Sequence, residues 1–104
     1  MTIKANVYDI GDLVRLSAIF KVLEVETDPS TVTVRIIDPS GVKEVLTYAD
    51  EEVTRDTTGR YHYDLLITES GYWSYRWEGT GAVVTAAEAR LYVRSSKFTE
   101  TESA

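Results

Sequence analysis

Apolar and polar side chains alternate along most of the chain, and this two-residue period is the feature that most constrains its fold. In residues 13–22, Val14, Leu16, Ala18 and Phe20 fall on one side of an extended backbone, and most residues between them are polar. A helix would instead repeat apolar residues at i, i+3 and i+4. No window does so, and the sequence therefore predicts strands. The same period recurs in five further segments, which are residues 32–37, 42–48, 61–67, 72–77 and 87–94.

Turn signals separate the predicted strands at intervals of about 8–12 residues, the spacing that is typical of a β-sandwich. Residues 38–41, Asp-Pro-Ser-Gly, carry proline at the second position and glycine at the fourth, as a type I turn prefers. A further short edge strand is expected around Val53. The sequence therefore predicts an all-β fold, an immunoglobulin-like β-sandwich of about seven antiparallel strands over residues 1–94. Residues 95–104 are polar and are expected to form a tail or docking arm.

The net charge of the 104-residue chain is −6, and this acidic excess argues against two classes of partner. Nonspecific affinity for nucleic acid comes mainly from Lys and Arg that neutralise phosphates, so no nucleic-acid partner is expected. Anionic membrane surfaces are disfavoured for the same reason, and no apolar run approaches the ~18 residues of a membrane span. Because cysteine is absent, disulfides and zinc–thiolate sites are impossible. The first residues lack the apolar region of a signal peptide, so synthesis in the cytoplasm is expected.

Residues 72–77 contain four large aromatic side chains, and three of them share one face of the predicted strand. Trp73, Tyr75 and Trp77 are spaced two residues apart. Such rings can line a sugar-binding groove, stack nucleobases or fill a core. Core filling is the expectation, because Trp and Tyr bury the largest areas and base stacking normally needs a basic groove. The preceding strand, residues 61–67, is expected to pair with this one as its cross-strand neighbour.

Two features near residue 60 have both a plain and a special interpretation. Residues 57–65 resemble a corner in which a Tyr hydroxyl bonds back to the chain across the sandwich, or else form an ordinary turn before a strand. His62 is the only histidine, and a Ser–His–Asp relay would need it beside a serine and an acid. Because His62 and Asp64 fall on the outward face of their strand, an exposed histidine without a catalytic role is expected. No catalytic, cofactor-binding or metal-ligating residue is therefore predicted.

Acidic residues between the strands have the oxygen ligands that calcium prefers. Asp50, Glu51, Glu52 and Asp56 cluster in one polar segment, without the Asp-x-Asp-x-Asp-Gly spacing of a calcium loop. We expect this segment to be a solvated loop. Hydrolysis by paired carboxylates would need one raised pKa in an apolar pocket, which a polar loop does not provide.

Four stretches together resemble a known family: YDIGDLVRLSAIF, DPSTVTVRIIDPSG, DTTGRYHYDL and GYWSYRWEGTGAV. Over residues 8 to about 94, the chain is similar to small immunoglobulin-like proteins of tailed bacteriophages and prophages, often encoded among head and head–tail genes. The resemblance implies a non-enzymatic virion structural protein, either a capsid decoration or a head–tail or neck component. It also implies a location in the virion, virion proteins as partners in a symmetric assembly, and no catalytic residue or cofactor.

The alternative function is an immunoglobulin-like carbohydrate-binding module for attachment to the host surface, which would need exposed and coplanar aromatic rings. An enzyme would need a cleft that holds His62 or two close carboxylates. A virion structural protein needs contact surfaces instead. Residues 1–7 and 95–104 are the expected contact arms.

Overall fold

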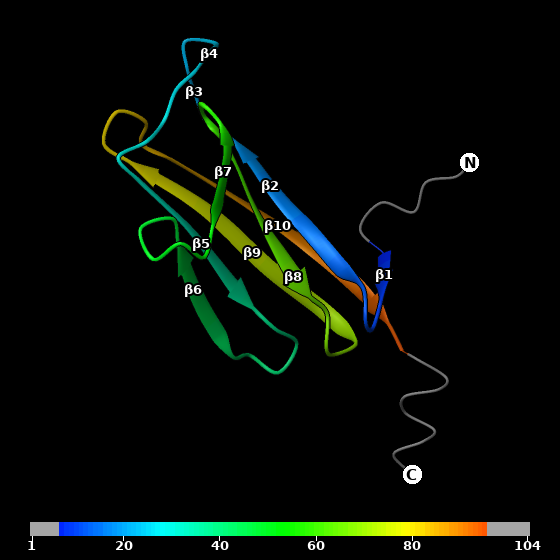
Figure 1. Cartoon of the computed structure of the whole chain (residues 1–104). Coiled ribbons are helices and arrows are strands. Elements are labelled where there is room, and N and C mark those ends of the chain that lie inside the picture. The colour runs from blue at the N-terminus through cyan, green and yellow to red at the C-terminus, as the bar shows by residue number, and fades with distance from the viewer. Residues whose placement is uncertain (1–6, 96–104) are drawn as a thin grey trace, which may run out of the picture.

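Residues 7–95 are the part of the chain that the computed structural model describes, and they form β-strands and no helix (Figure 1). The strands are β1 (Val7–Asp9), β2 (Leu13–Ile19), β3 (Lys21–Val22), β4 (Val25–Glu26), β5 (Thr31–Ile37), β6 (Lys43–Thr47), β7 (Thr54–Thr57), β8 (Arg60–Leu66), β9 (Gly71–Thr80) and β10 (Thr85–Arg94). The fold is all-β, as the alternation predicts. Residues 1–6 and 96–104, which include most of the two expected contact arms, lie outside the described residues.

The strands form a five-stranded sheet, a three-stranded sheet and a two-stranded hairpin. The five-stranded sheet has the order β1–β10–β9–β5–β6, and the three-stranded sheet has the order β2–β8–β7. β3 and β4 form the hairpin, which projects at one end of the molecule in Figure 1. The strand pairs are antiparallel except β1–β10, in which Val7 lies opposite Tyr92 in parallel register. The expectation of antiparallel strands alone is therefore wrong at this edge.

The sequence predicts seven of the ten strands, including the short strand expected around Val53, which is β7, and misses β1, β3 and β4. The strand predicted over residues 13–22 ends at Ile19, and Lys21–Val22 form the separate strand β3, which folds back on β4 through a two-residue turn at Leu23 and Glu24. Both turn residues have positive φ, 50° and 70°, where Asn and Gly are the usual choices, so the sequence gives no turn signal. β1 has only three residues, too few to show a period.

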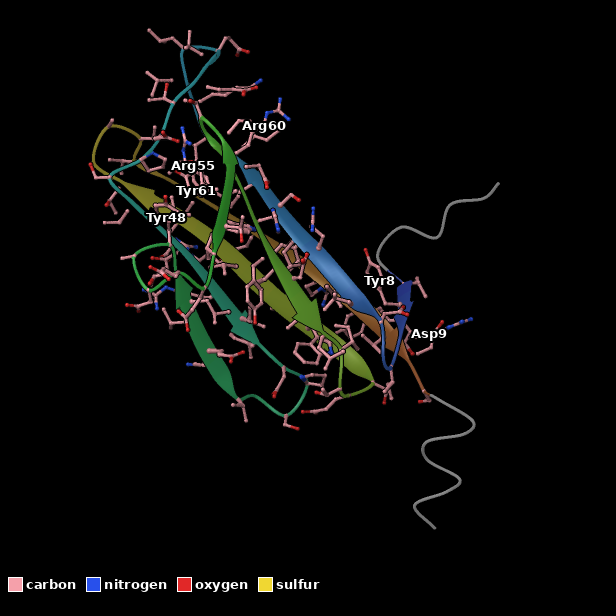
Figure 2. The ribbon with its side chains drawn as sticks, in the orientation of Figure 1. Tyr8, Asp9, Tyr48, Arg55, Arg60 and Tyr61 are labelled. Atoms are coloured by element: carbon pink, nitrogen blue, oxygen red, sulfur yellow. The ribbon has the colours of Figure 1, made fainter. Side chains whose placement is uncertain are left out.

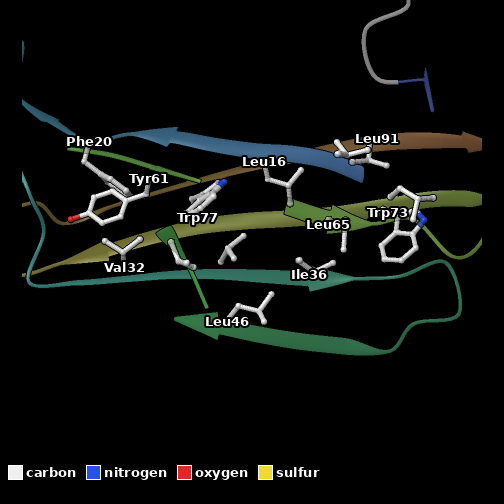
Figure 3. Close-up of a cluster of buried hydrophobic side chains, with 14 of the residues drawn as sticks. Leu16, Phe20, Val32, Ile36, Leu46, Tyr61, Leu65, Trp73, Trp77 and Leu91 are labelled. Carbon is white, nitrogen blue, oxygen red and sulfur yellow. The ribbon is translucent and has the colours of Figure 1, made fainter. Parts of the chain in front are cut away.

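β8 and β9 lie in different sheets, whereas the sequence predicts that they pair as neighbours. The connection at residues 67–70 carries the chain from one layer to the other. Figure 3 shows Tyr61 and Leu65 of β8 gathered with Trp73 and Trp77 of β9 in one buried cluster. The prediction of pairing is wrong because alternation gives the two faces of a strand but not its partner.

The core fills the space between the two larger sheets with the predicted inward faces. Val14 and Leu16 of β2 are 6% and 2% exposed, and Val32 and Val34 of β5 are 2% and 0% exposed. Each such side chain stabilises the fold by about 1.5–3 kcal/mol relative to leaving it in water. The inward faces of these strands are therefore confirmed.

β10 departs from the predicted pattern in its first half. Leu91 and Val93 are buried, as expected, but Ala87 and Ala89 on the same face of the strand are exposed. β1 pairs with β10 only from Tyr92 onward, so no described strand lies along the edge beside the two alanines. This face of β10 is therefore exposed up to Ala89 and buried from Leu91 onward, next to the point where β1 begins to pair with it.

Tyr61 of β8 makes a hydrogen bond to the segment that precedes β5, and its acceptor is a side chain rather than the backbone. Its hydroxyl donates to Oδ1 of Asp28 at 2.9 Å, and the N–H of Gly59 donates to the same oxygen at 2.8 Å. Arg55 also binds Asp28, and Figure 2 shows Arg55 and Tyr61 close together at this end of the molecule. In residues 57–65, a Tyr hydroxyl therefore bonds to a distant segment, as one of the two interpretations expects, but its acceptor is a carboxylate and not the backbone.

Candidate docking face

The outer face of the five-stranded sheet carries a groove with a volume of about 850 Å³. Most side chains that line the groove point away from the core because they are one position out of phase with the buried residues of the same strand; Tyr72, for example, precedes the buried Trp73. β5, β9 and β10 lie side by side, so residues far apart in the sequence meet on this face. The lining includes Arg35, Ile37, Tyr72, Arg76, Arg90 and Tyr92.

Four charged side chains form a ladder of ion pairs across the groove. Nε of Arg35 donates to Oε1 of Glu78 at 2.9 Å, and Nε of Arg76 donates to Oε2 of Glu78 at 2.7 Å. Nη1 of Arg76 also donates to Oε2 of Glu88 at 2.6 Å. The hydrogen bond from Arg35, followed by that from Arg76, lowers the pKa of Glu78. The ladder orients these side chains and largely neutralises their charges.

Two tyrosines and an arginine form the exposed aromatic end of the groove. The ring centroids of Tyr72 and Tyr92 are 5.1 Å apart with the ring planes tilted by 51°. The guanidinium carbon of Arg90 lies 4.6 Å from the centroid of the Tyr72 ring, within the range of a cation–π interaction. Tyr72 is 56% exposed and Tyr92 is 39% exposed. Tyr and Arg are enriched at the energetic centres of protein interfaces, so this end has the composition of a protein-binding surface.

The two tryptophans of residues 72–77 face the core and not the groove. Trp73 is 5% exposed and Trp77 is 4% exposed, which confirms core filling for both indoles. Nε1 of Trp73 donates to the carbonyl oxygen of Glu69 at 3.1 Å, whereas Nε1 of Trp77 has no acceptor among residues 7–95. Neither ring is available to sugars or bases in solvent. Tyr75 is half-buried against the same core.

His62 lies between two carboxylates on the outer side of the three-stranded sheet. Its Nδ1 is 2.8 Å from Oδ1 of Asp56, and its Nε2 is 3.9 Å from Oδ2 of Asp64. Only 12% of the side-chain surface is exposed, so the expectation of an exposed histidine is wrong. Ser17 lies opposite His62 on β2. None of these residues lines the groove, so they remain separate from the candidate docking face.

The acidic residues 50–56 form local hydrogen bonds. Oε1 of Glu52 accepts the backbone N–H of Thr47 at 3.0 Å, and Asp56 binds His62. Within the described range, no group of three or more His, Cys, Asp or Glu side chains is arranged to hold a metal ion. No metal ligand is assigned to this segment.

The sequence gives a signal for part of this surface and none for the rest. Alternation alone places Tyr72 and Tyr92 on the outward face. The prediction made for residues 72–77 nevertheless concerns only the face that carries Trp73, Tyr75 and Trp77. The ladder from Arg35 to Glu88 depends on the register of three strands, which the sequence does not show. The exposed tip of the β3–β4 hairpin is also missed; Leu23 there is 91% exposed.

Comparisons with known proteins found no protein-family model, no curated protein and no solved structure that matches the chain. In the described part of the chain, no helix is long and apolar enough to cross a membrane. The groove, the β3–β4 hairpin and the sequence resemblance are therefore the features that bear on function.

Proposed function

We propose that the two larger sheets form an immunoglobulin-like sandwich. The strand order supports this proposal, because β10–β9–β5–β6 follows the G–F–C–C′ order of variable-type domains and β2–β8–β7 follows the order B–E–D. The β3–β4 hairpin then occupies the connection between strands B and C, which is a binding loop in antibodies. The chain has no cysteine for an inter-sheet disulfide, and Trp73 and Trp77 fill the core instead.

We propose that this domain is a non-enzymatic structural protein of a tailed-phage virion, a capsid decoration or a head–tail or neck component, which acts by binding other virion proteins. The observation that carries this proposal is the groove, where Tyr72, Tyr92 and Arg90 are exposed outside a closed aromatic core. These residue types dominate the binding energy of protein interfaces. The sequence resemblance supplies the phage context.

The β3–β4 hairpin supports a second contact with a partner. Leu23 at its tip is 91% exposed, and Val25 beside it is 64% exposed. Leu23 and Glu24 hold positive φ, a costly conformation that tends to persist at functional sites. In a symmetric particle, weak contacts of this kind in several copies sum to firm attachment.

The carbohydrate-binding alternative needs exposed and coplanar rings. Trp73 and Trp77 are buried, and the exposed pair of Tyr72 and Tyr92 is tilted by 51°. No observation on this surface favours a sugar over a protein partner.

Mass spectrometry of purified particles tests the proposed location. We expect peptides of this chain in particles of the phage or induced prophage that encodes it, in a copy number that matches a symmetry of the particle. Electron microscopy should then show a sandwich-shaped density at the head surface or neck. Absence from particles, with the protein abundant in the lysate, would contradict the proposal.

The variant Tyr72→Ser tests the groove as the binding surface. We expect the purified variant to bind particles that lack the protein at least about tenfold more weakly than wild type, a loss of about 1.4 kcal/mol. Leu13→Ser is the matched control, because Leu13 is 66% exposed on the other sheet. Its affinity should be unchanged. Equal losses in both variants, or none in Tyr72→Ser, would remove the groove from the proposal.

A further inference from the structure

The first part of β10 is a free sheet edge within the described range. One edge of β10 pairs with β9 from Thr85 to Val93, and the other pairs with β1 only from Tyr92 to Arg94. The outer edge of Thr85–Leu91 therefore faces no described strand. This stretch contains neither Lys nor Pro, and its register with β9 shows no bulge. Of the features that usually blunt an edge, it has only the charges of Glu88 and Arg90.

The side chains along this edge are incompletely covered. Ala87 and Ala89 point toward the core side of the sheet and are nevertheless exposed, whereas Leu91 is 3% exposed. Small side chains on an open edge allow another backbone to approach closely. An added strand would continue the sheet by backbone hydrogen bonds and would cover both alanines.

We propose that β10 of a second copy of this chain pairs antiparallel with this edge about a twofold axis at Ala89. In this register, Glu88 lies opposite Arg90 of the partner subunit, and Arg90 lies opposite Glu88 of the partner subunit. On the inward face, Ala89 meets its own counterpart and Ala87 meets Leu91 of the partner subunit. Opposite charges that face each other across paired strands are stabilising, and twofold symmetry makes the charge pair twice.

The charges select this register over its neighbour. A twofold axis at Glu88 would place Glu88 against its own counterpart, and like charges directly opposite are destabilising. An axis at Ala89 ends the ladder at Leu91, where β1 begins to occupy the edge. Oε2 of Glu88 already binds Arg76, which leaves Oε1 for Arg90 of the partner subunit. The second copy is therefore favoured by a self-complementary charge pattern, independently of where the protein works.

Analytical ultracentrifugation of the purified chain tests the dimer. We expect a reversible dimer with a Kd on the order of 100 µM, because the ladder spans only residues 87–91 of each copy, whereas stable complexes bury at least ~1,000 Å². Arg90→Glu should raise the Kd at least about tenfold, since it places acidic residues opposite each other twice. The double variant Glu88→Arg with Arg90→Glu restores opposite charges and should return the Kd to within about threefold of wild type.

Lys43→Glu is the matched control, because it makes the same charge change on β6, at the other edge of the same sheet. Its Kd should equal that of wild type, and circular dichroism should show that all variants are folded. A chain that stays monomeric up to about 1 mM would overturn the proposal. A dimer that resists Arg90→Glu, or that the double variant fails to restore, would overturn it too.

Discussion

The hydroxyl of Tyr61 donates a hydrogen bond of 2.9 Å to Oδ1 of Asp28 and so ties β8 to the segment that precedes β5. Asp28 gathers further donors, which are the N–H of Gly59 at 2.8 Å and the guanidinium of Arg55, whose Nη2 lies 3.0 Å from Oδ2. Tyr61 is 2% exposed and meets Phe20 edge-on, with 5.7 Å between the ring centroids. One carboxylate therefore anchors the end of the core at which β8 begins.

The Asp28 carboxylate should make the free energy of unfolding decrease at acidic pH. The hydrogen bonds from Arg55 and then Gly59 lower the pKa of Asp28 to about 2, so its contribution is present above the unfolded pKa of about 3.9 and is lost as the pH falls toward about 2. We expect Asp28→Asn to lower the free energy of unfolding at neutral pH by on the order of 1 kcal/mol, a value discounted because the side chain is 38% exposed.

Urea unfolding of both proteins across this pH window measures the effect. The difference between wild type and Asp28→Asn should shrink as the pH falls from about 4 to about 2. Glu26 and Asp64, whose pKa values are also lowered by arginine partners, contribute equally to both proteins and cancel. A difference that stays constant through the window would contradict the role given to Asp28.

Tyr61 should make the free energy of unfolding decrease at alkaline pH. Burial, followed by the hydrogen bond to Asp28, raises the pKa of Tyr61 to about 12, so its contribution is complete below the unfolded pKa of about 10 and is lost as the pH rises toward about 12. Tyr61→Phe should cost about 1 kcal/mol at neutral pH and should flatten the alkaline decline. Tyr63 and Tyr75 also have raised pKa values, so part of the decline remains. An unchanged alkaline slope would contradict this assignment.

Gly59 and Gly41 allow the effect of crowding to be separated from that of backbone conformation. A Cβ at Gly59 would lie 2.7 Å from the carbonyl oxygen of Phe20 and 2.9 Å from the nitrogen of Thr27, whereas a Cβ at Gly41 meets nothing within 4 Å. Both glycines have positive φ, 77° and 91°. Gly41→Ala should therefore cost about 1–2 kcal/mol from conformation alone, and Gly59→Ala about 2–3 kcal/mol more. Equal losses in thermal unfolding would show that the Cβ at Gly59 is accommodated.

The sequence predicts those properties of the fold that depend on neighbouring residues along the chain, and not those that depend on which strands pair. The buried faces of β2, β5 and β9 are local, because alternation decides which side of a strand is apolar. The partner of each strand is not local: the four-residue connection after Leu66 could close a hairpin or cross between layers with the same alternation. The ion pair of Arg35 and Glu78 joins residues of two strands whose register no local pattern reveals. The all-β fold and the buried faces of its strands were therefore predictable, and most of the groove was not.

The two tryptophans should differ in what their loss costs. Trp73 donates its indole N–H to Glu69, and the buried indole N–H of Trp77 has no acceptor among the described residues. Replacement by Phe removes a hydrogen bond at the first position and an unpaired donor at the second. We expect Trp73→Phe to destabilise by about 1–2 kcal/mol more than Trp77→Phe, because a buried donor without a partner is itself costly. Urea unfolding, followed by circular dichroism, gives both values, and a reversed order would contradict this reasoning.

Substitution of both residues at the tip of the β3–β4 hairpin should raise the stability of the domain and weaken its binding to particles. Leu23 and Glu24 both have positive φ in a two-residue turn between Val22 and Val25, which is where Asn-Gly is preferred. The double variant Leu23→Asn with Glu24→Gly should therefore raise the free energy of unfolding by about 0.5–1 kcal/mol. Because it also removes the apolar side chain that is 91% exposed, the same variant should bind particles more weakly. Glu24→Gly alone is the control, since it relieves strain and keeps Leu23, and it should stabilise without loss of binding. If the double variant is more stable and binds as wild type does, the hairpin is not a contact and its exposed leucine has another cause.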